Sequence, residues 1–368
     1  MNIENDLVKK FIIPEQVDEN YYGNDGKKEK QTTKDLVYFE TYDDGLLRKK
    51  TQEIKETHST DYAIMNGAKV FNGLSVMEEK TNKRNISTYW LVTRCFHKYV
   101  YTSGNDGFLS GCRPNFVSVG MRPCLNLNLN PIIYLTSIGS HKLETKPVLD
   151  KDGKELYHIL EFGKFPQSKA KDCDMLENLY KDNKLKETGK SYLGRMNKSD
   201  GGFLDNKEFE FDGKKYVRVI TKKSDNFSRY RDGSKIVETG TPLWVEVKPI
   251  KWIIKNWDEL PKSINPKGKG TAKCIQLISA DSIISGIPYY PNGSEKIHAM
   301  WQNSLPRAYF NGYNIYKEIS KGNGEEQFKA EDNFDFDGNG FIEQALLQDM
   351  RNIDRYIQKS REDGGLSI

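Results

Sequence analysis

One acidic segment late in the chain has the residue types and spacing of a calcium-binding loop. Carboxylate and amide side chains alternate at Asp335, Asp337 and Asn339, with a glycine where such a loop bends. Oxygen ligands at alternate positions converge when a glycine turns the chain, which suits Ca²⁺. Glu343 follows at the ninth position, but Leu346 occupies the twelfth, where a bidentate glutamate belongs. The pattern predicts either a calcium site at these four polar residues or, more simply, a turn that enters a helix. We expect no other cofactor.

The cysteines and histidines form no recognisable catalytic or zinc-binding set. The five cysteines include no Cys-x-x-Cys pair, and the five histidines are scattered without His-x-x-x-His spacing. An odd number of cysteines in this arrangement favours reduced thiols over a disulfide framework. No serine or cysteine lies in a nucleophile elbow or beside a partnered base. We therefore expect a protein without enzymatic activity.

Tryptophan and arginine residues are expected to have a structural role. Only 36% of the residues are hydrophobic, so aromatic residues, at 11%, must supply much of the buried area. Buried arginines can donate to loop carbonyls and stack on aromatic rings. We therefore predict that six residues brace the fold and do not contact a ligand. These are Trp90, Arg94, Arg122, Trp252, Trp301 and Arg307.

Charge and hydropathy exclude several classes of function. The chain carries 56 basic and 52 acidic side chains, a net charge of +4, with both signs interspersed along its length. Nucleic-acid-binding proteins normally show a stripe of basic residues, so we expect no nucleic-acid partner. The absence of a run of eighteen apolar residues predicts no membrane span. Charged side chains throughout residues 1–15 predict no signal peptide, and therefore a cytoplasmic protein or part of a phage virion assembled there.

Turn and periodicity signals predict short strands, a few helices and long loops, which is the α+β fold class. Asp212-Gly213 between alternating apolar runs predicts a hairpin over 208–220. Ser304 is expected to cap a short helix, and apolar residues about four apart predict the longest helix over 341–359. Further helices are expected at 61–67, 172–180 and 280–285, and further strands at 88–93, 98–102, 115–119, 124–129, 155–162, 243–249, 250–255 and 272–278.

The segment 125–130 alternates leucine with asparagine. Successive side chains of a strand point to opposite faces of the sheet. The alternation therefore predicts an apolar face that packs on the core and an amide face that is open to solvent or a ligand.

Several short motifs fall into a later and an earlier group. The later group comprises Glu161-Phe162-Gly163-Lys164-Phe165-Pro166-Gln167, the run from Trp244 to Trp252, Ile287-Pro288-Tyr289-Tyr290, Trp301-Gln302-Asn303-Ser304 with Arg307, and Asn311-Gly312-Tyr313. The earlier group comprises Thr60-Asp61-Tyr62-Ala63, Tyr89-Trp90-Leu91 with Arg94, and Gly120-Met121-Arg122-Pro123. Together they resemble a family of uncharacterised bacterial and phage domains that is similar to the formylglycine-generating-enzyme branch of the C-type-lectin fold. The resemblance implies a C-type-lectin-like fold of short antiparallel strands, few helices and long loops.

The order of the motifs departs from the family's pattern, as though the chain were circularly permuted. Motifs that close the family's fold lie in residues 57–130, and motifs that open it lie in residues 161–313. The two groups either combine within one chain, which we favour, or are completed by a neighbouring chain through strand addition. This divides the chain into a flexible arm over 1–34, a closing half over 35–150, an opening half over 151–345 and a terminal helix over 346–368.

The resemblance implies a C-type-lectin-like binding module that recognises a protein or glycan surface, as a phage structural or adhesion component. The loops over 104–114 and 262–270 are expected to meet such a ligand. One alternative is a copper oxidase, because formylglycine-generating enzymes bind copper with a pair of cysteines. Cys112 and Cys124 would have to serve here, although neither lies in the family's motif. The other alternative is a structural assembly subunit that self-associates by strand complementation.

Overall fold

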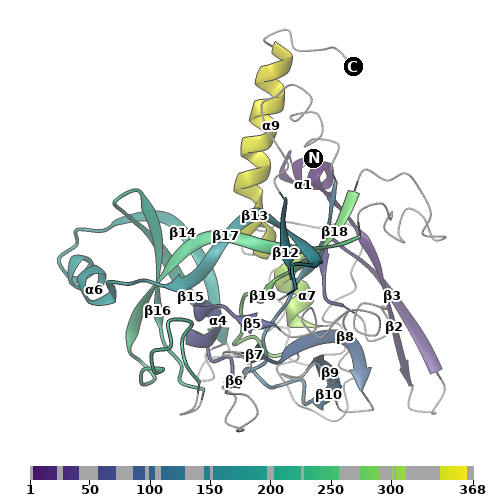
Figure 1. The fold of residues 1–368 in the computed structure, drawn as a ribbon, viewed down its shortest axis with the longest axis horizontal. Helices are drawn as coiled ribbons and strands as arrows, with labels where there is room; N and C mark the ends of the chain where they lie inside the picture. The colour runs from purple at the N-terminus through teal and green to yellow at the C-terminus, as the bar shows by residue number, and fades with distance from the viewer. Residues whose placement is uncertain are drawn as a thin grey trace.

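The computed structural model describes the chain with several gaps. The described residues are 3–22, 28–40, 57–71, 86–95, 99–103, 109–128, 145–149, 152–196, 203–224, 228–256, 274–289, 301, 304–311 and 340–362. They form mostly antiparallel sheets with few helices (Figure 1). This arrangement confirms the predicted α+β class.

Ten strands form one antiparallel sheet. They are β1 (Ile12–Ile13), β4 (Val37–Tyr38), β11 (Cys124–Asn128), β12 (Thr145–Leu149), β13 (Glu155–Lys169), β14 (Lys186–Met196), β15 (Phe203–Phe211), β16 (Lys214–Ile220), β17 (Pro242–Asn256) and β18 (Cys274–Ser279). Their order is β1, β11, β18, β17, β16, β15 and β14, while β4 also pairs with β11, and β12 joins through β13, which pairs with β17. Because β11 pairs with β18 along its whole length, the earlier and later parts of the sequence share one sheet.

Strand β17 lies at the centre of this sheet. One edge pairs with β13, and the other pairs with β16 from Pro242 to Glu246 and with β18 from Trp252 to Asn256. The sequence predicted two separate strands here, but the segment is one continuous strand. Pro249 lies between the two paired stretches and next to a bulge in β13, where a residue without an N–H group is tolerated.

Three smaller sheets accompany the main one. They contain β8 (Tyr89–Cys95), β9 (Tyr99–Ser103) and β10 (Leu109–Cys112); β5 (His58–Ser59), β6 (Val70–Phe71), β7 (Ile86–Ser87) and β19 (Asp281–Ser282); and β2 (Glu15–Tyr22) with β3 (Lys28–Asp35). The helix predicted over 280–285 is wrong, because this segment contains β19, which runs parallel to β5. The amide of Ile283 also donates to the carbonyl of Met121 at 3.0 Å, so long-range backbone hydrogen bonds set its extended conformation.

Residues 3–22 and 28–35 form regular secondary structure, although the sequence predicted a flexible arm over 1–34. These residues form helix α1 (Ile3–Phe11), strand β1 and the β2–β3 hairpin. Phe11 and Ile12 have no exposed surface, and Ile12 pairs with Leu127 of β11. The prediction failed because a short apolar pair in polar surroundings gives a weak sequence signal, while its partner strand lies more than a hundred residues away.

The remaining helices are α4 (Asp61–Met65), α6 (Cys173–Lys181), α7 (Leu305–Phe310), the π-helical turn η2 (Ile342–Leu346) and α9 (Leu347–Glu362). The predicted helix over 341–359 is confirmed by η2 and α9. The predicted cap of α7 is also confirmed, since the Ser304 hydroxyl accepts from the amide of Arg307 at 3.2 Å. Helix α4 is capped by Thr60, whose hydroxyl accepts from the amide of Ala63 at 3.1 Å.

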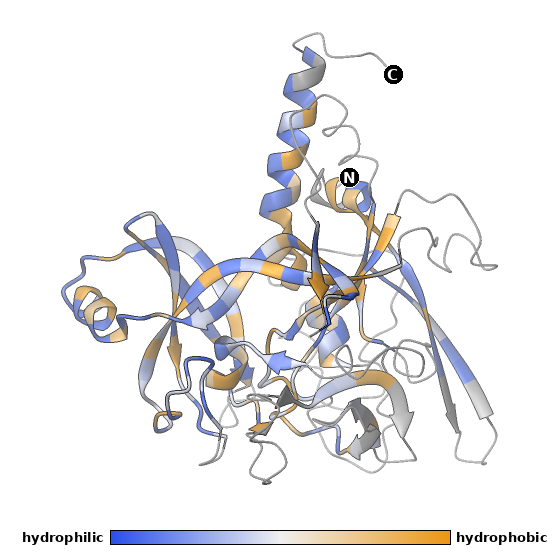
Figure 2. Ribbon diagram, viewed as in Figure 1, coloured by the Kyte–Doolittle hydropathy of each residue, from blue (hydrophilic) through white to orange (hydrophobic). Residues whose placement is uncertain are grey.

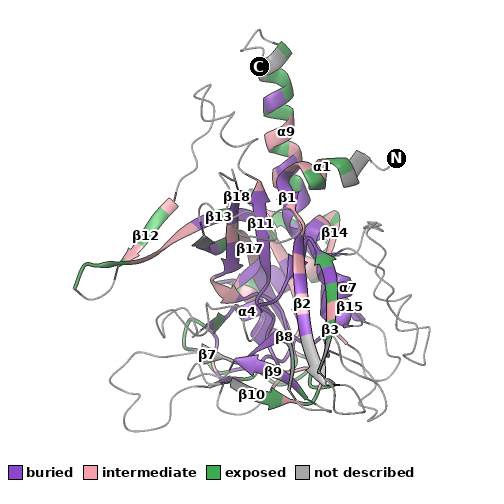
Figure 3. Cartoon of the chain, turned by 90° about the vertical axis from the view of Figure 1, so that its right-hand side faces the viewer, coloured by how far each residue is buried: buried purple, intermediate pink, exposed green. Residues whose placement is uncertain are grey.

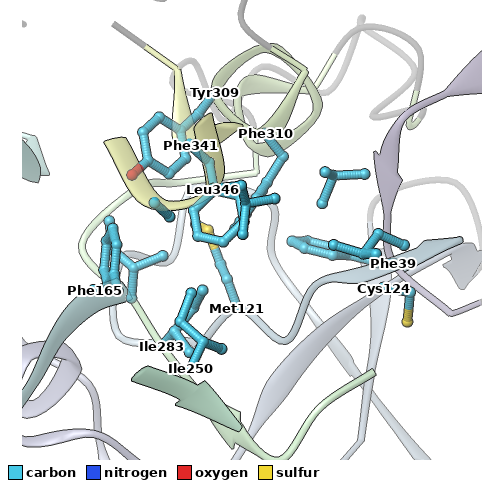
Figure 4. Close-up of a cluster of buried hydrophobic side chains, with 14 of the residues drawn as sticks. Phe39, Met121, Cys124, Phe165, Ile250, Ile283, Tyr309, Phe310, Phe341 and Leu346 are labelled. Atoms are coloured by element: carbon cyan, nitrogen blue, oxygen red, sulfur yellow. The ribbon is translucent and has the colours of Figure 1, made fainter. Parts of the chain in front are cut away.

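Apolar side chains from most of these elements form one large core. Buried residues of the main sheet, η2 and α7 all belong to this core. Figure 2 shows hydrophobic positions spread over many of the strands and helices. In Figure 4 the rings of Phe165, Tyr309, Phe310 and Phe341 surround Leu346. The Phe310 and Phe341 ring centroids are 4.9 Å apart in an edge-to-face arrangement, which is a favourable geometry for aromatic pairs. By contrast, the far part of α9 and strand β12 project from the body and are largely exposed (Figure 3).

The amide face of β11 is covered by the amino-terminal segment, although it was predicted to be open. Asn126 is fully buried, and its side-chain amide donates to the Glu15 carboxylate at 2.8 Å. Gln276 of β18 also donates to Glu15, at 3.3 Å. This part of the sheet is therefore buried on both faces, with a polar layer on one of them.

Replacing Gly163 should test the contact between β13 and the π-helical turn η2. Gly163 has φ +74, and a Cβ added there would lie 2.8 Å from the Ala345 carbonyl oxygen and clash with the Leu346 side chain. We expect Gly163→Ala to lower the free energy of unfolding by about 2–4 kcal/mol, measured by urea denaturation. The matched control is Gly213→Ala, because Gly213 has φ +69 but no atom within 4 Å of the added Cβ. Equal losses for both variants would contradict the packing argument.

Candidate recognition surface

Asp35 is a buried carboxylate that joins β3 to the later part of the chain. The Arg307 side chain donates through Nε to Oδ1 of Asp35 at 2.6 Å, and the Trp301 indole donates to Oδ2 at 2.7 Å. The Thr33 hydroxyl donates to the same Oδ2 at 2.6 Å. Asp35, Arg307 and Trp301 are at most 1% exposed. Removing one partner of a buried charge pair with this many hydrogen bonds strongly destabilises the folded protein.

Further hydrogen bonds join the same two segments. The Asn311 side-chain oxygen accepts from the amides of Leu36 and Val37, at 2.8 and 3.0 Å, and its nitrogen donates to the Val37 carbonyl at 2.8 Å. The Trp301 amide donates to the Glu19 carboxylate at 2.8 Å. The amino-terminal segment and α7 therefore form one hydrogen-bonded unit.

The other residues that we predicted to brace the fold are distributed over the body. Arg122 donates through Nε to the Ser279 carbonyl at 2.8 Å, and its guanidinium lies 5.3 Å from the centroid of the Tyr89 ring. The Trp252 indole donates to the Phe162 carbonyl at 2.7 Å.

Trp90 and Trp301 are linked through Tyr289, whose ring centroid lies 5.5 Å from Trp90 and 6.4 Å from Trp301. Trp90, Trp252, Trp301, Arg122 and Arg307 are all buried. Arg94 lies in β8, and its side chain is outside the described part of the structure. A ligand at the surface does not reach the five buried side chains, so a recognition site must use other residues.

Three of the four predicted metal ligands lie outside the described residues, so the calcium site stays a prediction. Asp335, Asp337 and Asn339 lie outside the described residues, and Glu343 lies in the first turn of η2. Within the described ranges, no group of three or more histidine, cysteine, aspartate or glutamate side chains has a metal-binding arrangement.

The two cysteines considered as copper ligands lie in different sheets. Cys112 belongs to β10 of the three-stranded sheet, and Cys124 belongs to β11 of the main sheet. Burial raises the pKa of the Cys112 thiol, and it raises the pKa of Cys274 to about 11. Because of these raised pKa values, both thiols stay protonated at neutral pH. The protonated form is the less reactive one, since metal binding needs the thiolate.

Residues 113–118 form an exposed turn, which we call the recognition turn. Arg113, Asn115 and Phe116 are exposed, and 48% of Phe116 is accessible to solvent. The amide of Phe116 donates to the Arg113 carbonyl at 3.1 Å, which closes the turn. The sequence predicted a strand at 115–119, and this prediction is wrong because Pro114 and Asn115 form the corner of the turn.

Two other segments hold the recognition turn in place. The amide of Lys69 donates to the Ser118 carbonyl at 3.0 Å, and the amide of Gly286 donates to the Val117 carbonyl at 2.8 Å. These two backbone hydrogen bonds join the end of the turn to the segment after α4 and to the segment after β19. Phe116 is therefore an exposed aromatic residue on a rigid support, which is the usual setting of a binding loop.

Four cationic side chains lie on segments that are hydrogen-bonded around this turn, and we call them the cationic face. None of them contacts a carboxylate of the described residues. They come from the recognition turn, from β14, and from the segments before and after residues 225–227. The four are Arg113, Arg195, Lys222 and Arg229.

The hydrogen bonds that connect the segments of the cationic face run through α4, the turn after it and β6. The amide of Arg195 donates to the Asn66 side chain at 3.0 Å, and the amide of Lys222 donates to the Met65 carbonyl at 2.7 Å. Ser228, next to Arg229, donates through its hydroxyl to the Val70 carbonyl at 3.0 Å. In Figure 1, α4 and β6 lie beside each other in the lower half of the molecule.

No family model, curated protein or solved structure matches the chain. Among the described residues, no helix is both long enough and apolar enough to cross a membrane.

Sequence reasoning located only part of this surface. Of the two loops expected to meet a ligand, 104–108 and 262–270 lie outside the described residues, while 109–114 forms β10 and the start of the recognition turn. Arg195 had no sequence signal, because it is a single basic residue in a strand. Its neighbours come from α4, β16 and the segment after β19, and only the tertiary structure brings these together.

Removing the charge of Asp35 should destabilise the whole fold. We expect Asp35→Asn to lower the free energy of unfolding by about 3–5 kcal/mol in urea denaturation, because Arg307 would keep a buried charge without its counterion. Lys184→Gln is the control, since it breaks a 2.9 Å ion pair with Asp182 in which both side chains are more than half exposed. That variant should change stability by less than about 0.5 kcal/mol. A loss for Asp35→Asn no larger than for the control would refute the central role of this carboxylate.

Proposed function

We propose that the protein is a non-enzymatic, C-type-lectin-like binding module that recognises a protein or glycan surface through the recognition turn. The observation that carries the proposal is the exposed Phe116, held on a turn that two other segments fix by backbone hydrogen bonds. An exposed aromatic residue on a rigid loop supplies contact area without a large cost in conformational entropy. The setting of a phage structural or adhesion component is part of the same proposal.

Support for the fold in this proposal comes from the way the two motif groups meet. Met121, in the earlier group, bridges to Ile284, which lies next to the later group. β11 and β18 pair in the same region. One chain can thus complete both groups without strands from a neighbour, which favours the intrachain arrangement.

Two buried tyrosines give further support for a binding role. Tyr62 and Tyr192 are buried side chains with chemistry-bearing groups, and both are engaged within the chain. The Tyr192 hydroxyl donates to Glu208 at 2.7 Å, and the Tyr62 hydroxyl donates to the Leu193 carbonyl at 2.9 Å. Burial raises the pKa of both phenols, so they stay protonated at neutral pH. These groups serve the fold, and the exposed surface is left for function.

The test is a binding screen of the purified protein against a glycan array and against surface extracts of bacterial cells. We expect binding that falls about tenfold or more in Phe116→Ala, because a central aromatic contact is worth about 1–2 kcal/mol or more at an interface. Tyr356→Ala is the matched control, since Tyr356 is 62% exposed but lies on α9. It should bind like the wild type.

Three outcomes would oppose the proposal. The first is a wild-type protein that binds neither glycans nor surface proteins, and the second is equal binding by Phe116→Ala and the wild type. The third is tight copper loading that requires Cys112 and Cys124, which would favour the oxidase alternative. Light scattering during the same screen would detect concentration-dependent oligomers, which the assembly-subunit alternative requires.

A further inference from the structure

Arg195 is a half-buried arginine that contacts no carboxylate of the described residues. Its guanidinium donates through one Nη atom to the Ile220 carbonyl, and it has no other side-chain hydrogen bond. Burial lowers the pKa of Arg195, and no carboxylate opposes this shift. The other guanidinium nitrogens do not belong to the fully buried polar atoms, so they reach the surface.

Three other arginines of the described residues have acidic partners. Arg218 makes a two-pronged contact with Glu177 at 3.0 and 2.9 Å. Arg231 pairs with Asp281 at 2.6 Å, and Arg307 pairs with Asp35. At these three positions the fold supplies a carboxylate to the guanidinium. The missing acid at Arg195 points to an anion that comes from outside the chain.

Two basic residues on neighbouring segments, Lys222 and Arg229, also contact no carboxylate of the described residues. Lys222 is exposed and packs its side-chain carbons against the turn at Gly67, where a Cβ would lie 3.4 Å from Lys222 Cγ. Arg229 donates to the Ser228 carbonyl at 3.2 Å and has no acidic partner. Lys222 and Arg229 therefore add two positive charges on segments that are hydrogen-bonded to the neighbourhood of Arg195.

Resting on the proposed function, we infer that the ligand is an acidic glycan, and that Arg195 binds one of its carboxylate or sulphate groups. The free edge of the guanidinium can donate two parallel hydrogen bonds to such an oxyanion. Lys222 and Arg229 supply nearby positive charge, and Phe116 offers a ring face against which a sugar can stack. The exposed turn and the recessed arginine together define a two-point contact.

A glycan fits this surface better than the other polyanions. Glu238 pairs with Lys223 beside Lys222, so acidic charge interrupts the continuous basic stripe that a nucleic-acid backbone needs. Of the large apolar side chains exposed in the described residues, Phe116 and Tyr99 lie near the turn, and Tyr99 precedes Val100, the strand partner of Cys112. Two separate rings do not provide the contiguous apolar core of a stable protein interface.

Binding should be measured by biolayer interferometry with polygalacturonate and dextran sulphate, against neutral dextran. We expect the wild type to bind the two acidic polymers, with affinity that falls as salt rises, and not to bind neutral dextran. Arg195→Gln should weaken binding at least tenfold, and Arg195→Lys should recover only part of it, because lysine lacks the planar fork. The control is Arg355→Gln, which removes an exposed charge from α9 and should leave affinity within twofold.

The outcomes separate this inference from the proposed function. If the wild type binds a neutral glycan or a protein in a Phe116-dependent way while Arg195→Gln binds equally well, the acidic-glycan inference fails and the binding module stands. If single-stranded DNA or polyglutamate binds more tightly than both acidic polysaccharides, the ligand class is wrong. If the wild type binds nothing, both proposals fail. Melting curves check that Arg195→Gln folds. If that variant does not fold, Lys222→Gln replaces it, because Lys222 is exposed, and this variant should weaken binding about threefold.

Discussion

The fold depends on burying the Asp35 carboxylate next to Arg307. Removing two charges from water costs several kcal/mol for each charge. Their mutual attraction offsets this desolvation cost only when further hydrogen bonds satisfy the remaining polar atoms. Trp301 and Thr33 provide these bonds, at 2.7 and 2.6 Å. Arg307 lies 272 residues from Asp35 in sequence. The network can therefore form only after the segments that carry these two residues have come together. The ion pair therefore selects one long-range arrangement.

The same long-range character governs the main sheet. β17 pairs with β13, β16 and β18, while β11 inserts between β18 and the amino-terminal strands β1 and β4. A strand that lies between partners from both ends of the sequence cannot be completed by local folding. Proteins dominated by such contacts fold slowly, because the entropy of closing long loops is lost before the contacts form. The lean core compensates with aromatic clusters such as Phe165, Phe310 and Phe341.

This division between local and long-range information explains which sequence predictions held. The 208–220 hairpin and the capped helix α7 were predicted correctly, because the Asp212-Gly213 turn and the Ser304 cap act on neighbouring residues. The amino-terminal segment and the strand at 281–282 were predicted wrongly, because distant partners determine their conformation. The candidate surface was found least well. Arg195 stands out because it contacts no carboxylate of the described residues. A sequence does not show which acidic residues lie near another residue in space.

The unpaired Arg195 and the paired Arg307 are two solutions to the same physical problem. For Arg307 the chain supplies its own carboxylate, so the charge stabilises the fold and is inaccessible to ligands. For Arg195 the chain supplies one carbonyl and leaves the rest of the guanidinium without an acid. Such a group has already lost part of its hydration before any ligand arrives, so an incoming oxyanion displaces less water and meets a fixed donor geometry. Preorganisation of this kind reduces the free-energy cost of binding. Because the turn after α4, β14 and the recognition turn are joined by backbone hydrogen bonds, the recessed charge and the exposed Phe116 keep a fixed relation, and recognition by this surface would select a ligand with an acidic group at a set distance from a stacking face.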